Sequence, residues 1–425
     1  MAERGSGSLG GHDGRLIFVE SNTTGSGMLA LRKAAALGLD PLFVTADPQR
    51  YAGLAETGCE VLVGDTNSLG LLLQTLKKDV GPGRVAGVLT TSEFYLVIVA
   101  EIALALGLQG NPPVAMRACR DKTETRRLLK TAGLGQPRFA VVRETASTAA
   151  LEAMAGVGLP CVVKPSDDTG SYEVRHCATA EEALAQIQRV LAIAKNVRGQ
   201  ATARTALIEE FVAAPEFSVE SFTWRGQTTC VGVTEKTLTG FPHFVEFRHV
   251  FPAPLSPQAT TALETTVRRA LAATGFSWGA AHTELKLTAA GPVVVEINAR
   301  LAGGMIPDLV LAALGVDLLE QQIKAAVGRA PDLTPTRSRR AGIQFIVSAK
   351  TGTLVSVDGV EAAREAPGVQ GVVVTGRPGR PVAPPRSAYD RLGYVIVSGD
   401  SRRDVTAGLR EAASRLRVIV EEEKP

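Results

Sequence analysis

The pattern of apolar and polar positions predicts alternating strands and helices at the start of the chain. Short apolar stretches typical of buried strands alternate with longer stretches of helical period. The strands are expected at residues 15–20, 41–46, 60–63 and 87–91, and the helices at 28–37, 69–77 and 96–106. This order is typical of βαβ units, so the region is predicted to form a parallel sheet between helices.

A second region shows a different pattern. Strands are predicted at residues 137–142, 160–164 and 206–211, and helices at 121–131, 178–193 and 255–274. Residues 217–248 alternate with a period of two, as antiparallel strands do, and residues 282–287 and 292–298 read as neighbouring strands. The fold class is therefore α/β followed by α+β.

Breaks in the pattern divide the chain into four segments. Asn111-Pro112-Pro113 ends the first region, and a Pro/Arg-rich stretch at 331–340 precedes short strands at 342–349, 371–374 and 393–399 and a helix at 404–416. The expected segments are a tail at 1–14, a first domain at 15–113, a central domain at 114–334 and a smaller domain at 335–425.

Composition excludes several classes of protein. The 425 residues suffice for two to four domains, and 45% hydrophobic with 21% charged residues argues against disorder. A net charge of +3 predicts neither a nucleic-acid nor a membrane partner. The chain has neither an apolar run near the ~20 residues of a membrane span nor the apolar core of a signal peptide at its start.

Cysteine usage favours a cytoplasmic location. The chain has five cysteines, an odd number, and none stands in a C-x-x-C pair. A disulfide framework and a cysteine-based zinc site are therefore not expected, and a reducing compartment is the simplest setting.

The first candidate site is a glycine turn. The stretch from Gly25 to Ala30 (GSGMLA) fits G-x-G-x-x-G/A after a strand, with Asp47 twenty residues beyond Gly27. This is the form of a dinucleotide fingerprint, which would make the protein an NAD(P)-dependent oxidoreductase. The same turn also serves simple packing in many α/β sheets, and nothing downstream indicates a hydride-transfer site.

A second set of candidates suits a nucleotide. Lys164 ends a strand and precedes a small polar loop that includes Gly170 and Ser171, so the lysine and the loop N–H groups can meet a phosphate. A later strand runs through Glu209, Glu210, Phe211 and Val212, and Glu216 opens the next one. Its edge can offer backbone groups to an adenine, although acidic residues at strand ends are more often simply solvated.

The most specific signal lies in the strand pair near residue 290. Glu296, Asn298 and Arg300 share one strand face, and Glu284 lies across a short turn from them. Two carboxylates and an amide on one sheet face suit Mg²⁺, and an arginine beside them can hold a phosphate or carboxylate. Packing alone does not explain this pattern in an otherwise apolar strand.

The ordered set resembles the ATP-grasp superfamily of carboxylate–amine ligases. The stretch from Glu296 to Gly304 (EINARLAGG) is especially similar to the branch of L-amino-acid ligases and carnosine synthase. The resemblance covers roughly residues 15–400. It implies a Rossmann-like N-terminal domain, a two-lobed ATP-grasp core with a lid lobe at about 135–208, and a small C-terminal α+β domain.

The resemblance also implies roles for individual residues. ATP would be bound by Lys122, Lys164, Gly170, Ser171, Glu209, Glu210, Phe211, Val212 and Glu216. Magnesium, or manganese in its place, would be bound by Glu284, Glu296 and Asn298. The amino-acid substrate would meet Glu246, His249, Arg300, Gly303 and Gly304, and Arg300, His249 and Glu246 would serve catalysis. Arg248 stands where the family's E-x-x-H-x-x-P segment more usually has glycine, which predicts a different pocket.

The expected activity is an ATP-dependent ligation. A carboxylate, expected to be that of an amino acid, would form an acyl phosphate, and an amine would then attack it with release of ADP and phosphate. The partners would be small molecules, and the commonest assembly would be a homodimer. The oxidoreductase and a non-catalytic ATP-binding module remain the alternatives.

Overall fold

The computed structural model describes residues 14–23, 26–80, 84–144 and 147–422. It divides into two compact units, one of residues 1–113 with 320–331 and one of residues 114–319 with 332–425. Each unit is described by itself. The boundaries of the four segments expected from the sequence remain a prediction.

The first unit contains a parallel sheet. Its strands are β1 (Arg15–Val19), β2 (Asp40–Thr45), β3 (Glu60–Val63) and β4 (Val85–Leu89), in the order β3-β2-β1-β4. All neighbouring pairs are parallel, as the alternating pattern predicts. The helices are α1 (Ser26–Ala36), α2 (Leu69–Asp79), α3 (Leu96–Ala105) and most of α10 (Leu318–Ala326), with short 3₁₀ turns at Pro48–Arg50, Ala55–Thr57 and Glu93–Tyr95.

The glycine turn after β1 packs closely on itself. Gly25 lies outside the described residues, but Gly27 opens α1 directly against the turn. A Cβ added to Gly27 would stand 2.0 Å from the backbone oxygen of Asn22, so no larger residue fits without moving the chain. Close packing therefore accounts for this glycine without a dinucleotide.

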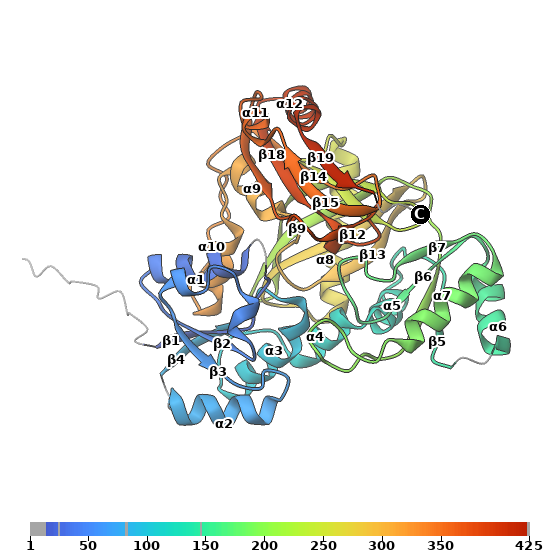
Figure 1. Ribbon diagram of the computed structural model, residues 1–425. Helices are drawn as coiled ribbons and strands as arrows, with labels where there is room; N and C mark the ends of the chain where they lie inside the picture. Colours follow the sequence, from blue (N-terminus) through green and yellow to red (C-terminus); the bar gives the residue numbers. More distant parts are fainter. Residues whose placement is uncertain (1–13, 24–25, 81–83, 145–146, 423–425) are drawn as a thin grey trace, which may run out of the picture. The chain divides into compact units, whose positions relative to one another are not determined.

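The second unit begins with a small antiparallel sheet. Its strands are β5 (Phe139–Val142), β6 (Cys161–Pro165), β7 (Arg175–Cys177) and β8 (Ala206–Glu210), in the order β5-β8-β6-β7. Helices α6 (Ser147–Val157) and α7 (Ala180–Ala192) bury their apolar side chains against it, including Met154, Ile187 and Val190. Figure 1 shows this lobe in green. Its other face carries Lys164 and Glu209.

A large antiparallel sheet forms the body of the second unit. It runs β13-β12-β9-β10-β11-β14-β18-β16 and packs with helices α8, α9 and α12. The strands are β9 (Glu216–Trp224), β10 (Gln227–Thr239), β11 (Val245–Phe251), β12 (Gly279–Thr288), β13 (Gly291–Asn298), β14 (Arg340–Ile346), β16 (Val369–Val374) and β18 (Gly393–Gly399). The helices are α4 (Pro113–Arg120), α5 (Lys122–Thr131), α8 (Pro257–Thr274), α9 (Ile306–Leu314), α11 (Val360–Arg364) and α12 (Arg402–Arg415).

The C-terminal region extends this sheet. Strand β14 pairs with β11, and β18 pairs with β14, so three C-terminal strands continue the sheet that begins with β13. A second small sheet, β17-β15-β19, is built from β15 (Gly352–Asp358), β17 (Pro381–Val382) and β19 (Arg417–Glu421). The 3₁₀ turn Ala388–Asp390 precedes β18, and Ala388 and Arg391 line the cavity described in the next section.

Two further features concern the cysteines and the apolar helices. All five cysteines lie in the described ranges and are free thiols. Among the helices of the described ranges, none combines the length and apolar character needed to cross a membrane.

Candidate active site

One cavity in the second unit is lined by nearly all the residues that the sequence singles out. They come from the small sheet, from the loop after β6, and from one face of the large sheet. The predicted residues at this cavity are Lys122, Lys164, Gly170, Ser171, Glu209, Glu210, Phe211, Val212, Glu216, Glu246, Glu284, Glu296, Asn298, Arg300, Gly303 and Gly304. Residues from three predicted roles therefore converge on one place.

Lys164 and Glu209 form a buried ion pair at the small sheet. Val162 pairs with Glu209 and Lys164 with Leu207, which places the two charged side chains diagonally on one face. Lys164 Nζ lies 2.7 Å from Glu209, and Arg126 Nε donates to the same carboxylate at 2.6 Å. Burial raises the pKa of Glu209, but Arg126 and Lys164 outweigh it and bring the pKa to about 2. Its carboxylate is therefore engaged by Lys164 and Arg126.

Arg126 ties this pair to the large sheet. It is 1% exposed and also donates to the backbone oxygens of Val294 and Val295 in β13, at 3.0 and 2.6 Å. Arg126 is not among the residues predicted from the sequence. Its spacing of four residues from Lys122 on the same helix face was the available signal.

Lys122 opens α5 at the other side of the cavity. Asp121 caps the helix, and Lys122 Nζ donates to the backbone oxygen of Asp168 at 2.6 Å and lies 3.0 Å from Glu296. Arg120 donates to the neighbouring backbone oxygen of Asp167 at 2.6 Å. These bonds fix the polar loop after β6, where Gly170 has a left-handed backbone with φ of 70°.

The acidic pair predicted for metal binding is brought together by strand register. Glu284 in β12 lies directly opposite Glu296 in β13, and directly opposed residues share a face. Asn298 lies two residues further along β13, and its Oδ1 accepts from Arg300 at 3.3 Å. Within the described ranges, no group of three or more His, Cys, Asp or Glu side chains is arranged to hold a metal ion alone.

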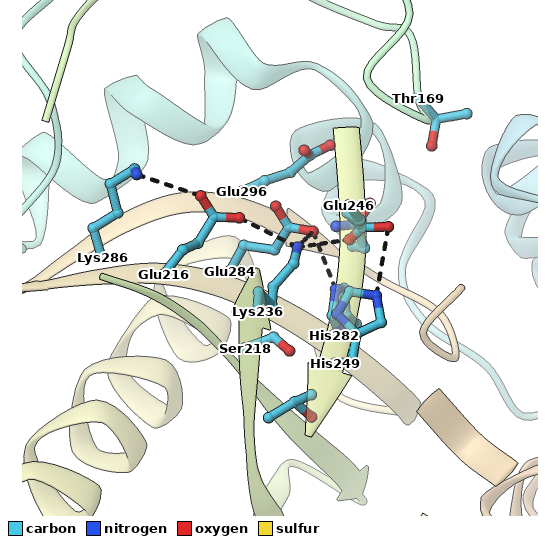
Figure 2. Close-up of polar contacts among 12 residues, drawn as sticks. Thr169, Glu216, Ser218, Lys236, Glu246, His249, His282, Glu284, Lys286 and Glu296 are labelled. Carbon is cyan, nitrogen blue, oxygen red and sulfur yellow. Dashed lines mark hydrogen bonds and ion pairs between the residues drawn. The ribbon is translucent and has the colours of Figure 1, made fainter. Parts of the chain in front are cut away.

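A lysine that the sequence analysis missed stands among the acids. Figure 2 shows Lys236 of β10 between Glu216, Glu246 and Glu284. Its Nζ lies 3.4, 2.8 and 2.6 Å from these carboxylates, in that order. Burial lowers the pKa of Lys236, but the three acids outweigh it and hold the pKa well above its usual value. The ammonium is therefore charged.

A buried histidine, His282, contacts Glu284. His282 Nδ1 lies 3.0 Å from the buried Glu220, and its Nε2 lies 3.1 Å from Glu284. Burial lowers the pKa of His282, but Glu220 and Glu284 outweigh it and raise the pKa to about 9. The charged ring therefore links two carboxylates.

Glu246 and His249 lie at the far side of the cavity. Arg391, from the C-terminal region, donates to Glu246 Oε2 at 2.9 Å and stacks 3.7 Å above the ring centre of Phe345. His249 is fully buried, and within the described residues neither ring nitrogen has a hydrogen-bond partner. Burial lowers its pKa to about 4. Unlike Glu246, His249 is not among the described residues that line the cavity; it lies behind Glu246 and Gly304.

Arg300 follows the end of β13 and faces the same cavity. It donates to the backbone oxygen of Leu301 at 2.9 Å and approaches Thr169 of the polar loop at 3.5 Å. Gly303 and Gly304 follow, and the backbone of Gly304 is left-handed with φ of 59°. A cation and two consecutive glycines thus lie at one end of the acidic face.

Comparison with known proteins identifies this arrangement. Residues 157–308 match the ATP-grasp domain, and residues 344–421 match the L-amino acid ligase C-terminal domain 2. The uncharacterized protein y4rH of Sinorhizobium fredii is 32% identical across 94% of this chain and 82% of its own length. The chain belongs to the ATP-grasp ligase family.

Two further relatives of this ATP-grasp ligase are informative. Carnosine synthase 1 of Homo sapiens is 30% identical over 58% of this chain, which spans 31% of that relative's length. The crystal structure of L-amino acid ligase from Bacillus licheniformis superposes with a TM-score of 0.79 at 24% identity, covering 96% of this chain and 99% of that one. The predicted ATP-grasp fold is confirmed, and the matched families give no support to an oxidoreductase.

Proposed function

We propose that this ATP-grasp ligase joins the carboxylate of an amino acid to an amine, with an acyl phosphate as the intermediate and ADP and phosphate as products. The main support for this proposal is that two lysines, an opposed pair of glutamates and Arg300 all line one cavity. Two of the relatives are named as a carnosine synthase and an L-amino acid ligase, which supports the proposal. No covalent enzyme nucleophile is needed, because positioning and charge suffice for phosphoryl transfer.

Lys122 and Lys164 are placed to hold the phosphates of ATP. Their ammonium groups reach the cavity from two sides, and each is oriented by a carboxylate, Glu296 or Glu209. Phe211, Val212 and Glu216 line the part of the cavity proposed for the adenine and ribose. A few lysines at the cavity are therefore enough to bind an anionic nucleotide, although the net charge of the chain is only +3.

The donor set at the acidic pair fits Mg²⁺. Glu284, Glu296 and Asn298 would hold the ion through oxygen atoms, the ligand type that Mg²⁺ prefers. When bound, the ion supplies neutralisation of charge on the phosphates. Manganese can use the same oxygen ligands.

The substrate carboxylate and amine are proposed to lie between Glu246 and Arg300. Arg300 and the N–H groups near Gly303 and Gly304 are suited to stabilise an oxyanion. The polar loop closes this end, since Gly170 accepts from the backbone N–H of Ala388 at 3.1 Å. Such a cover keeps water from a reactive acyl phosphate.

The test is a panel of amino acids and amines with ATP and magnesium. We expect ADP and phosphate to form only when particular amino acids are present, together with an amide seen by mass spectrometry. ATP turnover that ignores the amino acids, or reduction of NAD(P), would contradict the proposal. A panel with tight ATP binding and no turnover would favour a non-catalytic module.

Replacing Glu296 with alanine should weaken the dependence on magnesium. The change removes one of two opposed carboxylates and also a partner of Lys122. We expect the magnesium concentration for half-maximal rate to rise at least about tenfold, since a ligand is lost. The measurement is a magnesium titration of ADP formation, and an unchanged curve would exclude the ligand role.

Replacing His249 with alanine should change the accepted amino acids more than the binding of ATP. The ring lies behind Glu246 and against Gly304, both of which belong to the proposed substrate part of the site. We expect the order of KM values across the amino-acid panel to change while the ATP KM stays within about threefold. A collapse of ATP affinity with unchanged selectivity would place His249 outside the substrate pocket.

Two broader expectations belong with this proposal. We retain a cytoplasmic location, which the free cysteines favour. We also retain a homodimer as the expected assembly.

A further inference from the structure

Lys236 is the residue shared by three carboxylates that have different proposed tasks. Glu216 belongs to the ribose part of the site, Glu284 to the metal part and Glu246 to the substrate part. The three acids come from three strands, β9, β12 and β11, and each lies within 3.4 Å of the same ammonium. The Lys236 side chain is 1% exposed, so water screens these contacts little.

Strand register explains why one lysine reaches all three. In β10, Lys236 lies directly opposite Glu216 on one side and directly opposite His249 on the other. Glu284 stands one strand beyond β9, where it pairs with Ser218. The long side chain of Lys236 therefore rises over the sheet at the point where nucleotide and substrate residues meet (Figure 2).

Each acid also has a cation of its own. Glu216 lies 3.4 Å from Lys286, Glu246 lies 2.9 Å from Arg391, and Glu284 lies 3.1 Å from His282. Those cations each serve one of these three acids. Lys236 is the residue that joins the three pairs into a network, and removing it would leave three partly buried carboxylates to repel one another.

We propose that Lys236 is a positioning residue that couples the nucleotide half of the site to the amino-acid half, by holding Glu216, Glu284 and Glu246 in place through one shared ammonium. The inference rests on the proposed function for the tasks of the three acids. When a ligand binds to one of the three carboxylates, the ion pairs between Lys236 and the other two carboxylates change in strength. Binding in each half therefore alters affinity in the other, and this coupling is reciprocal.

The test is Lys236→Met, which keeps a similar length and removes the charge. We expect the dissociation constant of ADP, titrated calorimetrically with magnesium, and the KM of the amino acid each to rise at least about tenfold. A lysine that only packs the core would lower the melting temperature and leave both constants near wild type. Both constants within about twofold of wild type in a folded Lys236→Met protein would overturn the proposal, as would a change in one constant alone.

Lys286→Met is the matched control. Lys286 also lines the cavity, but of the three acids it contacts Glu216 alone. We expect weaker ADP binding with an amino-acid KM within about twofold of wild type. An equal rise of both constants in this control would show that any lost cavity lysine has the same effect, and would also overturn the proposal.

A second variant decides the matter if Lys236→Met does not fold. The carboxylate of Glu246 lies within ion-pair distance of Lys236, Arg391 and His249, and Lys236 is the one of these that also contacts Glu216 and Glu284. Glu246→Gln should therefore change the ADP dissociation constant at least about threefold, and an unchanged constant would overturn the coupling. The ADP titration needs no turnover, whereas a wild-type protein without amino-acid-dependent ADP formation would refute the proposed function alone.

Discussion

Replacing Arg300 with alanine should lower the rate of amino-acid-dependent ADP formation at least about 100-fold, the usual cost of losing an oxyanion donor. The guanidinium lies at the end of β13, between Asn298 and Thr169 of the polar loop. It therefore touches both the acidic face and the cover of the cavity. Its charge acts where negative charge grows on the reacting carbonyl, so the loss should fall on kcat more than on ATP binding.

Two controls separate chemistry from folding in this experiment. Arg300→Lys keeps the charge and loses the planar fork, so we expect an intermediate rate. Arg402→Ala removes an exposed arginine that pairs with Glu235, and we expect the wild-type rate. An Arg300→Ala protein that turns over within about threefold of wild type would exclude the proposed role.

Replacing Arg126 with methionine should lower the free energy of unfolding of the second unit by about 3–5 kcal/mol, because it breaks a buried ion pair. Glu209 would keep only Lys164 as a charged partner, and the bonds to Val294 and Val295 would be lost. Both tryptophans of the chain, Trp224 and Trp278, lie in this unit with ring centres 4.3 Å apart. Their fluorescence in a urea titration reports on its unfolding.

The neighbouring Arg127 is the matched control. It is 62% exposed and pairs with Glu124, so Arg127→Met should leave the free energy of unfolding nearly unchanged.

The pH dependence of this stability follows from Glu209, whose pKa is held at about 2. The contribution of the Glu209 carboxylate to the free energy of unfolding is complete above the ordinary glutamate pKa and is lost as the pH falls through about 2. Without Arg126 that carboxyl protonates more readily, so the destabilisation should be smaller near about pH 4 than near pH 7. Equal effects of the two substitutions would contradict the account.

The sequence predicted the parts of the site that lie within continuous motifs. Glu296, Asn298 and Arg300 follow one another at a spacing of two; β13 ends at Asn298, just before Arg300, yet all three residues line the same cavity. Glu284 was placed beside them because a short turn joins the two strands, and register confirms the pairing. Local periodicity is enough for such predictions.

The residues that the sequence did not reveal depend on contacts between distant elements. In the sequence, Lys236 looks like a solvated lysine in an alternating strand. Its carboxylate partners become evident only when β10 is paired with β9 and β11. Arg391 reaches Glu246 because the C-terminal strands extend the large sheet, which no local pattern indicates. The helix α4 begins at Pro113, where the sequence suggested only a break, because proline is tolerated in a first helical turn.

The most direct test of the central claim follows an oxygen atom from substrate to phosphate. An accepted amino acid labelled with ¹⁸O in its carboxylate is converted with ATP and the amine, and the released phosphate is analysed by mass spectrometry. An acyl-phosphate route predicts that one labelled oxygen appears in the phosphate for each amide formed, with ADP as the other product. Unlabelled phosphate, or AMP and pyrophosphate in place of ADP, would contradict the account.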